Sequence, residues 1–140
     1  MSTVNNSEQL FDNSVKILTD LIGFKTISGG DNSSLIDYCD DILKKLGTKS
    51  FRTFDDEKKR VNLFATLKAK SSQLKKPIIL SGHTDVVPVS KGWSSDPFTA
   101  TIKGDKLYGR GSCEMKGFIA CDLAYAPTFS KSNLDRDIHF

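Results

Sequence analysis

The chain has 140 residues, of which 38% are hydrophobic and 26% are charged, and its formal net charge is +3. This length suits one domain whose core buries roughly 68–70% of the surface of the unfolded chain. No apolar run approaches the roughly 18 residues that cross a membrane, and acidic residues interrupt the basic clusters. We therefore expect one globular domain that binds neither membranes nor nucleic acid.

The N-terminal sequence and the cysteines indicate where such a domain works. The first residues, "MSTVNNSEQLFDNS", lack the basic start and apolar core of a secretory signal, which favours the cytoplasm. Cys39, Cys113 and Cys121 are an odd number without a CxxC pair. This pattern predicts reduced thiols rather than a disulfide framework or a thiolate zinc site.

The first predicted helix follows from apolar periodicity. Apolar side chains recur at steps of three and four residues from Phe11 to Ile22, with Asn6 or Ser7 as the N-cap and Gly23 just beyond the end.

A second helix is predicted from Leu35 to Leu46 by the same spacing. Ser33 or Ser34 is its expected N-cap, and Gly47 supplies a left-handed stop.

The spacing then changes to that of strands. "SFRTFDD" and "VNLFATL" are predicted strands, and the uniformly apolar "PIILSG" is expected inside the sheet. "FTATIKGDKLYG" predicts a hairpin with a Lys-Gly-Asp turn, "GFIACDLAYA" predicts a helix that Pro127 ends, and "DIHF" begins a last strand. Two helices before a mostly parallel sheet indicate the α/β class.

His83 and Asp85 follow the apolar strand directly, at the edge where open α/β sheets place ligands. A neutral imidazole is a common metal ligand, and a carboxylate often accepts its second ring N–H. Because side chains two residues apart lie on one side of an extended chain, Asp85 is expected to orient His83. A strand-end histidine with a purely local hydrogen bond is the alternative.

A second stretch, "LYGRGSCEMKG", adds the acid Glu114 in a glycine-flanked turn before a helix. Gly109, Gly111 and Gly117 permit close backbone approach, as a loop around an ion requires. Hairpin and helix-cap geometry explains the same glycines equally well.

Three neighbouring features have both a functional and a structural interpretation. Arg110 either grips a substrate carboxylate or pairs with Glu114 or Asp105. Trp93 in "GWSSDPF" is expected to pack against the sheet rather than to line a pocket. Cys113 has no histidine near it in sequence and is expected to be a buried thiol rather than a nucleophile.

The motifs "SGHTDVVPV", "GW" followed by "SDPF", and "LYGRGSCEMKGFIA" resemble the acetylornithine deacetylase branch of the M20 family of metal-dependent amidohydrolases. The resemblance covers roughly residues 11–140. It implies a three-layer α/β fold with a mostly parallel sheet, in which residues 1–140 form the N-terminal part of the zinc-dependent exopeptidase-like catalytic domain. It also implies hydrolysis of N2-acetyl-L-ornithine to L-ornithine and acetate, a step of arginine biosynthesis.

Roles for single residues follow from the resemblance. His83 would bind one of two zinc or cobalt ions, Asp85 would be the catalytic residue that orients His83, and Glu114 would bridge both metals. The substrate would be a small N-acyl amino acid, and the complete enzyme would be a homodimer.

The sequence departs from the family pattern in two respects. Glu114 stands where the family has aspartate, which moves the carboxylate by about 1.5 Å, one carbon–carbon bond. The paired glutamates of the general base, the remaining metal ligands and the inserted dimerisation domain have no counterpart in this sequence. We therefore expect the chain alone to be inactive and to bind metal poorly, and a complementary C-terminal chain is an expected partner. A non-catalytic interaction module and another M20 specificity, such as desuccinylase or carboxypeptidase, are the alternatives.

Overall fold

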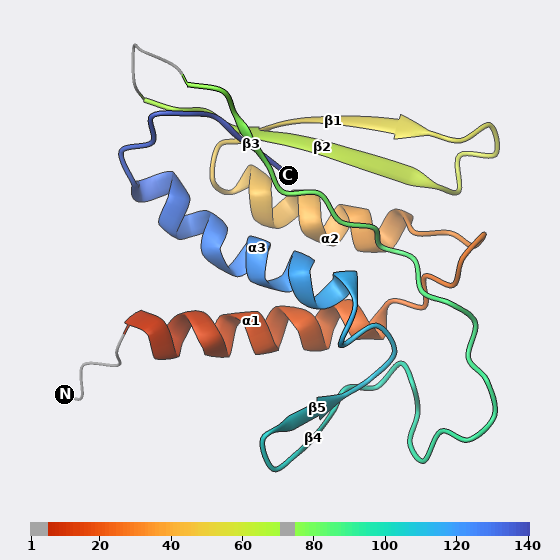
Figure 1. Ribbon diagram of the computed structural model, residues 1–140. Helices are drawn as coiled ribbons and strands as arrows, with labels where there is room; N and C mark the ends of the chain where they lie inside the picture. Colours follow the sequence, from red (N-terminus) through yellow and green to blue (C-terminus); the bar gives the residue numbers. More distant parts are fainter. Residues whose placement is uncertain (1–5, 71–74) are drawn as a thin grey trace.

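The computed structural model describes residues 6–70 and 75–140 as a mixed α/β structure (Figure 1). Its elements are α1 (Asn6–Gly23), α2 (Ser33–Lys44), β1 (Lys49–Phe54), β2 (Val61–Leu67), β3 (Ile78–Ile79), β4 (Thr101–Lys103), β5 (Lys106–Tyr108), α3 (Met115–Lys131) and β6 (Ile138–His139). The predicted strand "VNLFATL" coincides with β2, and the predicted hairpin is formed by β4 and β5. None of the described helices is long and apolar enough to cross a membrane.

The helix ends differ in part from the expected caps. α1 already includes Asn6, so its N-cap position lies outside the described residues. Asn32 is the N-cap of α2, and the Asp31 carboxylate accepts the backbone N–H of Ser33 at 2.7 Å. Gly47 adopts φ +77°, which confirms the left-handed stop after α2.

The main sheet of the described chain has the strand order β1-β2-β6-β3. β1 and β2 are antiparallel because the short turn between them forms a hairpin, and β6 runs antiparallel to β2. Only the β6–β3 pair is parallel, since α3 makes the crossover between these strands. The α/β class is confirmed, whereas the expectation of a mostly parallel sheet holds only at this edge.

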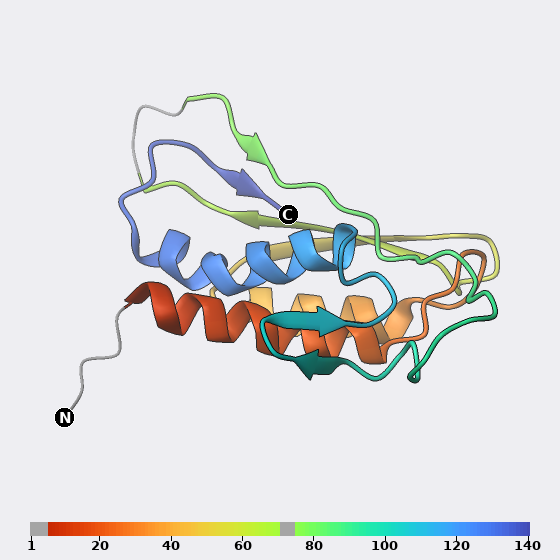
Figure 2. The same ribbon diagram turned by 60° about the horizontal axis from the view of Figure 1, so that its bottom comes forward.

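The helices lie on one face of the sheet (Figure 2). α2 packs against β2, and α3 packs against both α2 and α1. The register pairs Phe51 with Phe64 on the opposite face, where these side chains are 67% and 44% exposed. Three layers were expected. The described residues form two of them, the sheet and the helices on one side of it.

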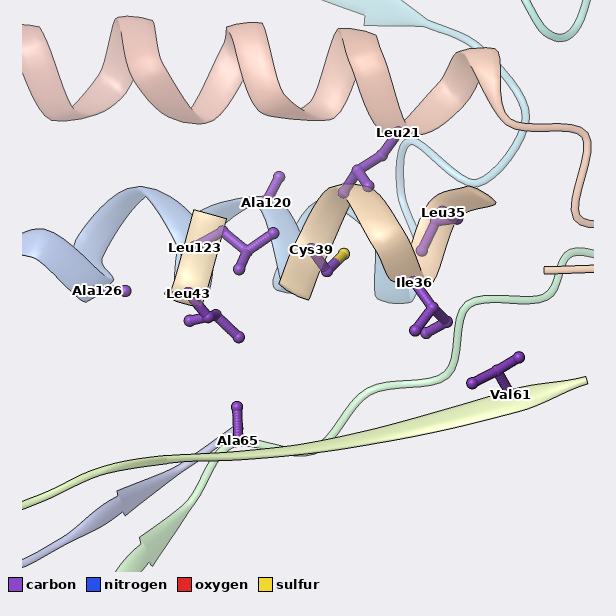
Figure 3. Close-up of a cluster of buried hydrophobic side chains, with 10 residues drawn as sticks. All are labelled: Leu21, Leu35, Ile36, Cys39, Leu43, Val61, Ala65, Ala120, Leu123 and Ala126. Atoms are coloured by element: carbon purple, nitrogen blue, oxygen red, sulfur yellow. The ribbon is translucent and has the colours of Figure 1, made fainter. Parts of the chain in front are cut away.

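The core fills the space between the helices and the sheet (Figure 3). Leucine and isoleucine side chains of α1 and α2 meet small residues of α3 and β2 there. Its buried members are Leu21, Leu35, Ile36, Cys39, Leu43, Val61, Ala65, Ala120, Leu123 and Ala126. The cluster includes most of the apolar positions on which the second helix was predicted, but only Leu21 of the first, whose Phe11 is 67% exposed.

Pro127 does not end α3, which continues to Lys131. A proline inside a helix removes the hydrogen bond to the carbonyl four residues earlier, here that of Leu123. Ala124 and Ala126 are buried on the preceding turn, and α3 packs along α1. This packing offsets the lost hydrogen bond, which is why the expected boundary was wrong.

Candidate functional site

The segment after β3 carries the first part of the site. β3 is an edge strand, and Ile78 and Ile79 are 43% and 64% exposed, so the prediction of a buried central strand was wrong. The physical reason is that β3 pairs only with β6 in the described chain. Beyond β3 the chain leaves the sheet, and the buried Val86 forms an isolated parallel bridge with Ile27 outside the named strands.

The structure brings His83 and Asp85 together as expected. The His83 Nδ1 atom lies 3.1 Å from Asp85 Oδ1 and 3.1 Å from the backbone oxygen of Asp85. A proton on Nδ1 satisfies these acceptors and leaves the Nε2 lone pair free. The hydroxyl of Ser28 donates to Asp85 Oδ2 at 2.6 Å, and this bond, followed by the nearby imidazole, lowers the pKa of Asp85.

The second motif approaches the first through Arg110 and Gly111. Arg110 Nε donates to the backbone oxygen of Val87 at 2.8 Å, so Arg110 tethers the two motifs, a contact that neither of its two sequence interpretations included. Gly111 adopts φ +86°, and a Cβ atom there would lie 2.9 Å from a methyl group of Val86. This contact requires glycine and confirms the prediction of close backbone approach.

Glu114 is the N-cap residue of α3, and its exposed side chain makes no capping hydrogen bond. Within residues 6–70 and 75–140, histidine, cysteine, aspartate and glutamate side chains form no group of three or more that could hold a metal ion. Catalytic zinc sites usually keep three protein ligands. His83 and Glu114 therefore do not make a metal site by themselves, and their roles as ligands stay predictions.

The thiol and aromatic residues near the motifs differ in exposure from what was expected. Cys113 is exposed rather than buried, because it lies in the turn that precedes α3. Trp93 is 38% exposed, so it does not pack fully against the sheet.

A cavity of about 530 Å³ opens beside His83 and Asp85. Apolar and polar side chains both line it, and Phe140 borders it. Asp122 of α3 also lines this cavity, and burial raises the pKa of its carboxyl to about 6. Asp122 was not among the predicted site residues, although an acid within the apolar stretch "GFIACDLAYA" is the sequence signal for it.

Asp122→Asn is expected to stabilise the protein at pH 7 by about 1–2 kcal/mol. The folded-state pKa of about 6 lies above the unfolded value of about 3.9. Stability from this group is therefore fully present below about pH 4 and is lost as pH rises through 6. Urea unfolding at pH 4 and pH 7 measures the difference, with Asp56→Asn in an exposed turn as control. Equal increases in the free energy of unfolding for both variants at pH 7 would contradict the raised pKa of Asp122.

Comparison with known proteins supports the resemblance to the M20 family but not its assignment to the acetylornithine deacetylase branch, because the relatives are named succinyl-diaminopimelate desuccinylases. Residues 79–140 match the model of Peptidase family M20/M25/M40. The chain is thus similar to this family over its C-terminal part. It is 41% identical over 125 residues to a succinyl-diaminopimelate desuccinylase of Rickettsia akari (strain Hartford), in an alignment that covers 85% of this chain and 32% of that protein.

Solved structures show the same M20 fold. An M20 family metallo-carboxypeptidase from Sulfolobus solfataricus superimposes with a TM-score of 0.74 at 25% identity, over 91% of this chain and 30% of that one. Human carnosine dipeptidase 1 gives a TM-score of 0.73 at 21% identity, over 95% of this chain and 33% of that chain, which supports the fold alone. The chain spans about a third of the length of the curated relatives it matches.

Proposed function

We propose that this M20 chain supplies the His83–Asp85 part of the active site of an amidohydrolase. The reaction is hydrolysis of the amide bond between a small acyl group and the amine of an amino acid. The contact of His83 Nδ1 with Asp85 at 3.1 Å, beside a cavity of about 530 Å³, carries the proposal. It leaves Nε2 of His83 available for the chemistry of the site.

Two substrates are proposed, each on its own observation. Succinyl-diaminopimelate comes first, because the relatives that align over most of this chain are named as its desuccinylases. N2-acetyl-L-ornithine, with a role in arginine biosynthesis, comes second, because the details "GW", "SDPF" and "GRGSC" resemble that branch. Both reactions release a carboxylic acid and a free amine, so one amine assay compares them.

Zinc, or cobalt, is the proposed cofactor of the completed site. His83 Nε2 and the Glu114 carboxylate are the atoms that this chain would contribute. Because the chain spans about a third of its relatives, we propose that the other ligands and the general base come from further polypeptide. That polypeptide is either continuous with this chain or a complementary C-terminal chain, and the complete enzyme is proposed to be a homodimer.

A complementation experiment tests the proposed function. The chain is mixed with the remaining two thirds of the Rickettsia akari relative in the presence of zinc, and amine release is measured from both substrates. Hydrolysis in the mixture, its absence with either part alone, and its loss with His83→Ala are expected. If the chain is instead a non-catalytic interaction module, the two parts will bind each other without hydrolysing either substrate.

Glu114→Asp is expected to raise the zinc affinity of the completed site about fivefold, corresponding to about 1 kcal/mol. The shorter side chain places the carboxylate where the family motif has it, and metal sites tolerate ligand displacements of only about 0.2 Å. Calorimetric zinc titration of the mixture measures the change. Glu57→Asp, in the exposed β1–β2 turn, is the matched control, and equal affinities for all three proteins would show that the extra methylene has no effect.

A further inference from the structure

The loop between α1 and α2 holds the His83 segment along its backbone. Thr26 Oγ1 donates to the backbone oxygen of Thr84 at 2.6 Å, and the Val86 N–H donates to the backbone oxygen of Thr26 at 2.9 Å. Asn32 Nδ2 donates to Thr84 Oγ1 at 3.0 Å. The Ser28 N–H donates to the backbone oxygen of Val86, also at 3.0 Å. These bonds fix the backbone on both sides of Asp85 and leave its side chain to be held separately.

The side chain of Ser28 performs that second task. Its hydroxyl lies 2.6 Å from Asp85 Oδ2 and 3.3 Å from the backbone oxygen of Val86. A hydroxyl has one proton, and a bond to a carboxylate is shorter and stronger than a bond to a neutral oxygen. The proton of Ser28 therefore goes to Asp85 Oδ2, while Oδ1 faces His83 Nδ1 at 3.1 Å.

We propose that Ser28 is a positioning residue, which holds the Asp85 carboxylate so that His83 carries its proton on Nδ1 and keeps Nε2 unprotonated. Its value for catalysis rests on the proposed function, whereas its effect on the imidazole does not. Free rotation of the Asp85 carboxylate is the physical alternative, because both side chains of the pair are more than half exposed. Ser28 limits this rotation by occupying one carboxylate oxygen.

The geometry does not support a nucleophilic role for Ser28. A serine nucleophile gives its proton to a base such as histidine, but the Ser28 hydroxyl donates to the Asp85 oxygen that does not face His83. The order of contacts is serine to aspartate to histidine. Ser28 can thus act on the reaction only through Asp85.

Nuclear magnetic resonance of the two imidazoles tests the proposal on the chain as it exists, without metal or substrate. At pH 8.5, nitrogen-15 spectra report which ring nitrogen of each neutral histidine carries the proton. In the unmodified chain His83 is expected to be mainly protonated on Nδ1. In Ser28→Ala the ratio of the Nε2–H to the Nδ1–H form is expected to rise at least about threefold, and Ser28→Thr is expected to restore the original ratio.

Two references make this measurement decisive. Asp85→Ala leaves only the backbone acceptor for His83 Nδ1 and sets the upper limit of the change. His139, whose Nδ1 lies 3.0 Å from Thr66 Oγ1, is the internal control and must stay constant. The exposed Ser28 side chain makes unfolding of Ser28→Ala unexpected, and unchanged His139 signals verify the fold. An unaltered His83 ratio in Ser28→Ala would overturn the proposal.

The activity readout separates this inference from the proposed function. In the complemented enzyme Ser28→Ala is expected to lower kcat/KM about tenfold, at the low end for partners that orient a metal-binding histidine. Failure of complementation with a normal tautomer shift would reject the amidohydrolase and keep the positioning role. Full activity of Ser28→Ala together with an unchanged tautomer would reject the positioning role and keep the amidohydrolase.

Discussion

Lys116→Met is expected to lower the free energy of unfolding by about 2–3 kcal/mol. Lys116 is only 1% exposed, and its Nζ donates to the backbone oxygens of Leu21 at 2.9 Å and Phe24 at 2.8 Å. These carbonyls lie at the C-terminal end of α1, whose last turn within the described chain contains no basic residue. Methionine keeps much of the apolar stem but leaves both carbonyls without their donor and removes the cation from the negative end of the helix dipole.

Chemical denaturation followed by circular dichroism measures this loss. Lys131→Met is the matched control, because Lys131 lies at the C-terminal end of α3, the helix that also contains Lys116. This variant should change the free energy of unfolding by less than about 0.5 kcal/mol. A loss of similar size for both variants would show that the buried hydrogen bonds of Lys116 do not stabilise the fold.

The pH dependence of the same variant gives an independent check. Burial lowers the pKa of Lys116 to about 8, whereas an unfolded lysine has a pKa of about 10.4. Between these values the unfolded chain binds more protons than the folded one, so the contribution of Lys116 to stability rises with pH. The stability difference between the unmodified chain and Lys116→Met should therefore widen from pH 7.5 to pH 10, and a constant difference would contradict this pKa shift.

Local sequence signals predicted most of the elements but not the position of every strand. The apolar spacing of the two N-terminal helices and of β2 indicated that each element buries one face, and in the structure these faces meet in the core. The run "PIILSG" gave a misleading signal, because apolar residues on an edge strand look the same in sequence as residues of a central strand. The helix end predicted at Pro127 was wrong for a related reason, because packing of α3 on α1 stabilises the helix beyond a residue that locally favours its end.

The candidate site was predictable where its contacts are short in sequence. His83 and Asp85 are two residues apart, so an extended chain brings them together without help from the rest of the fold. Ser28 reaches Asp85 from 57 residues away, and no periodicity indicates such a contact. Lys116 shows the same limit: it belongs to the second motif, yet its partners are Leu21 at the end of α1 and Phe24 just beyond it, 95 and 92 residues earlier.

Asp85→Asn is expected to lower kcat/KM of the complemented enzyme by about 10- to 100-fold, the usual effect of changing a residue that orients a metal-binding histidine. Asparagine has nearly the shape of aspartate but lacks its charge. Its amide nitrogen is a donor, which cannot accept the hydroxyl proton of Ser28 or the Nδ1 proton of His83. With the amide nitrogen toward His83 the contact at 3.1 Å is lost, and with the nitrogen toward Ser28 the contact at 2.6 Å must reverse its direction, so either orientation changes one of the two contacts.

Steady-state kinetics with succinyl-diaminopimelate and N2-acetyl-L-ornithine measure this effect, and zinc titration shows whether affinity falls in parallel. Asp56→Asn removes the same charge from an exposed turn between β1 and β2 and should leave both quantities within about twofold of the original. A similarly small effect of Asp85→Asn would mean that the contact with His83 at 3.1 Å is incidental. The backbone oxygen of Asp85 alone would then hold the imidazole. The hydrogen bond from Ser28 to the Asp85 carboxylate would have no effect on His83.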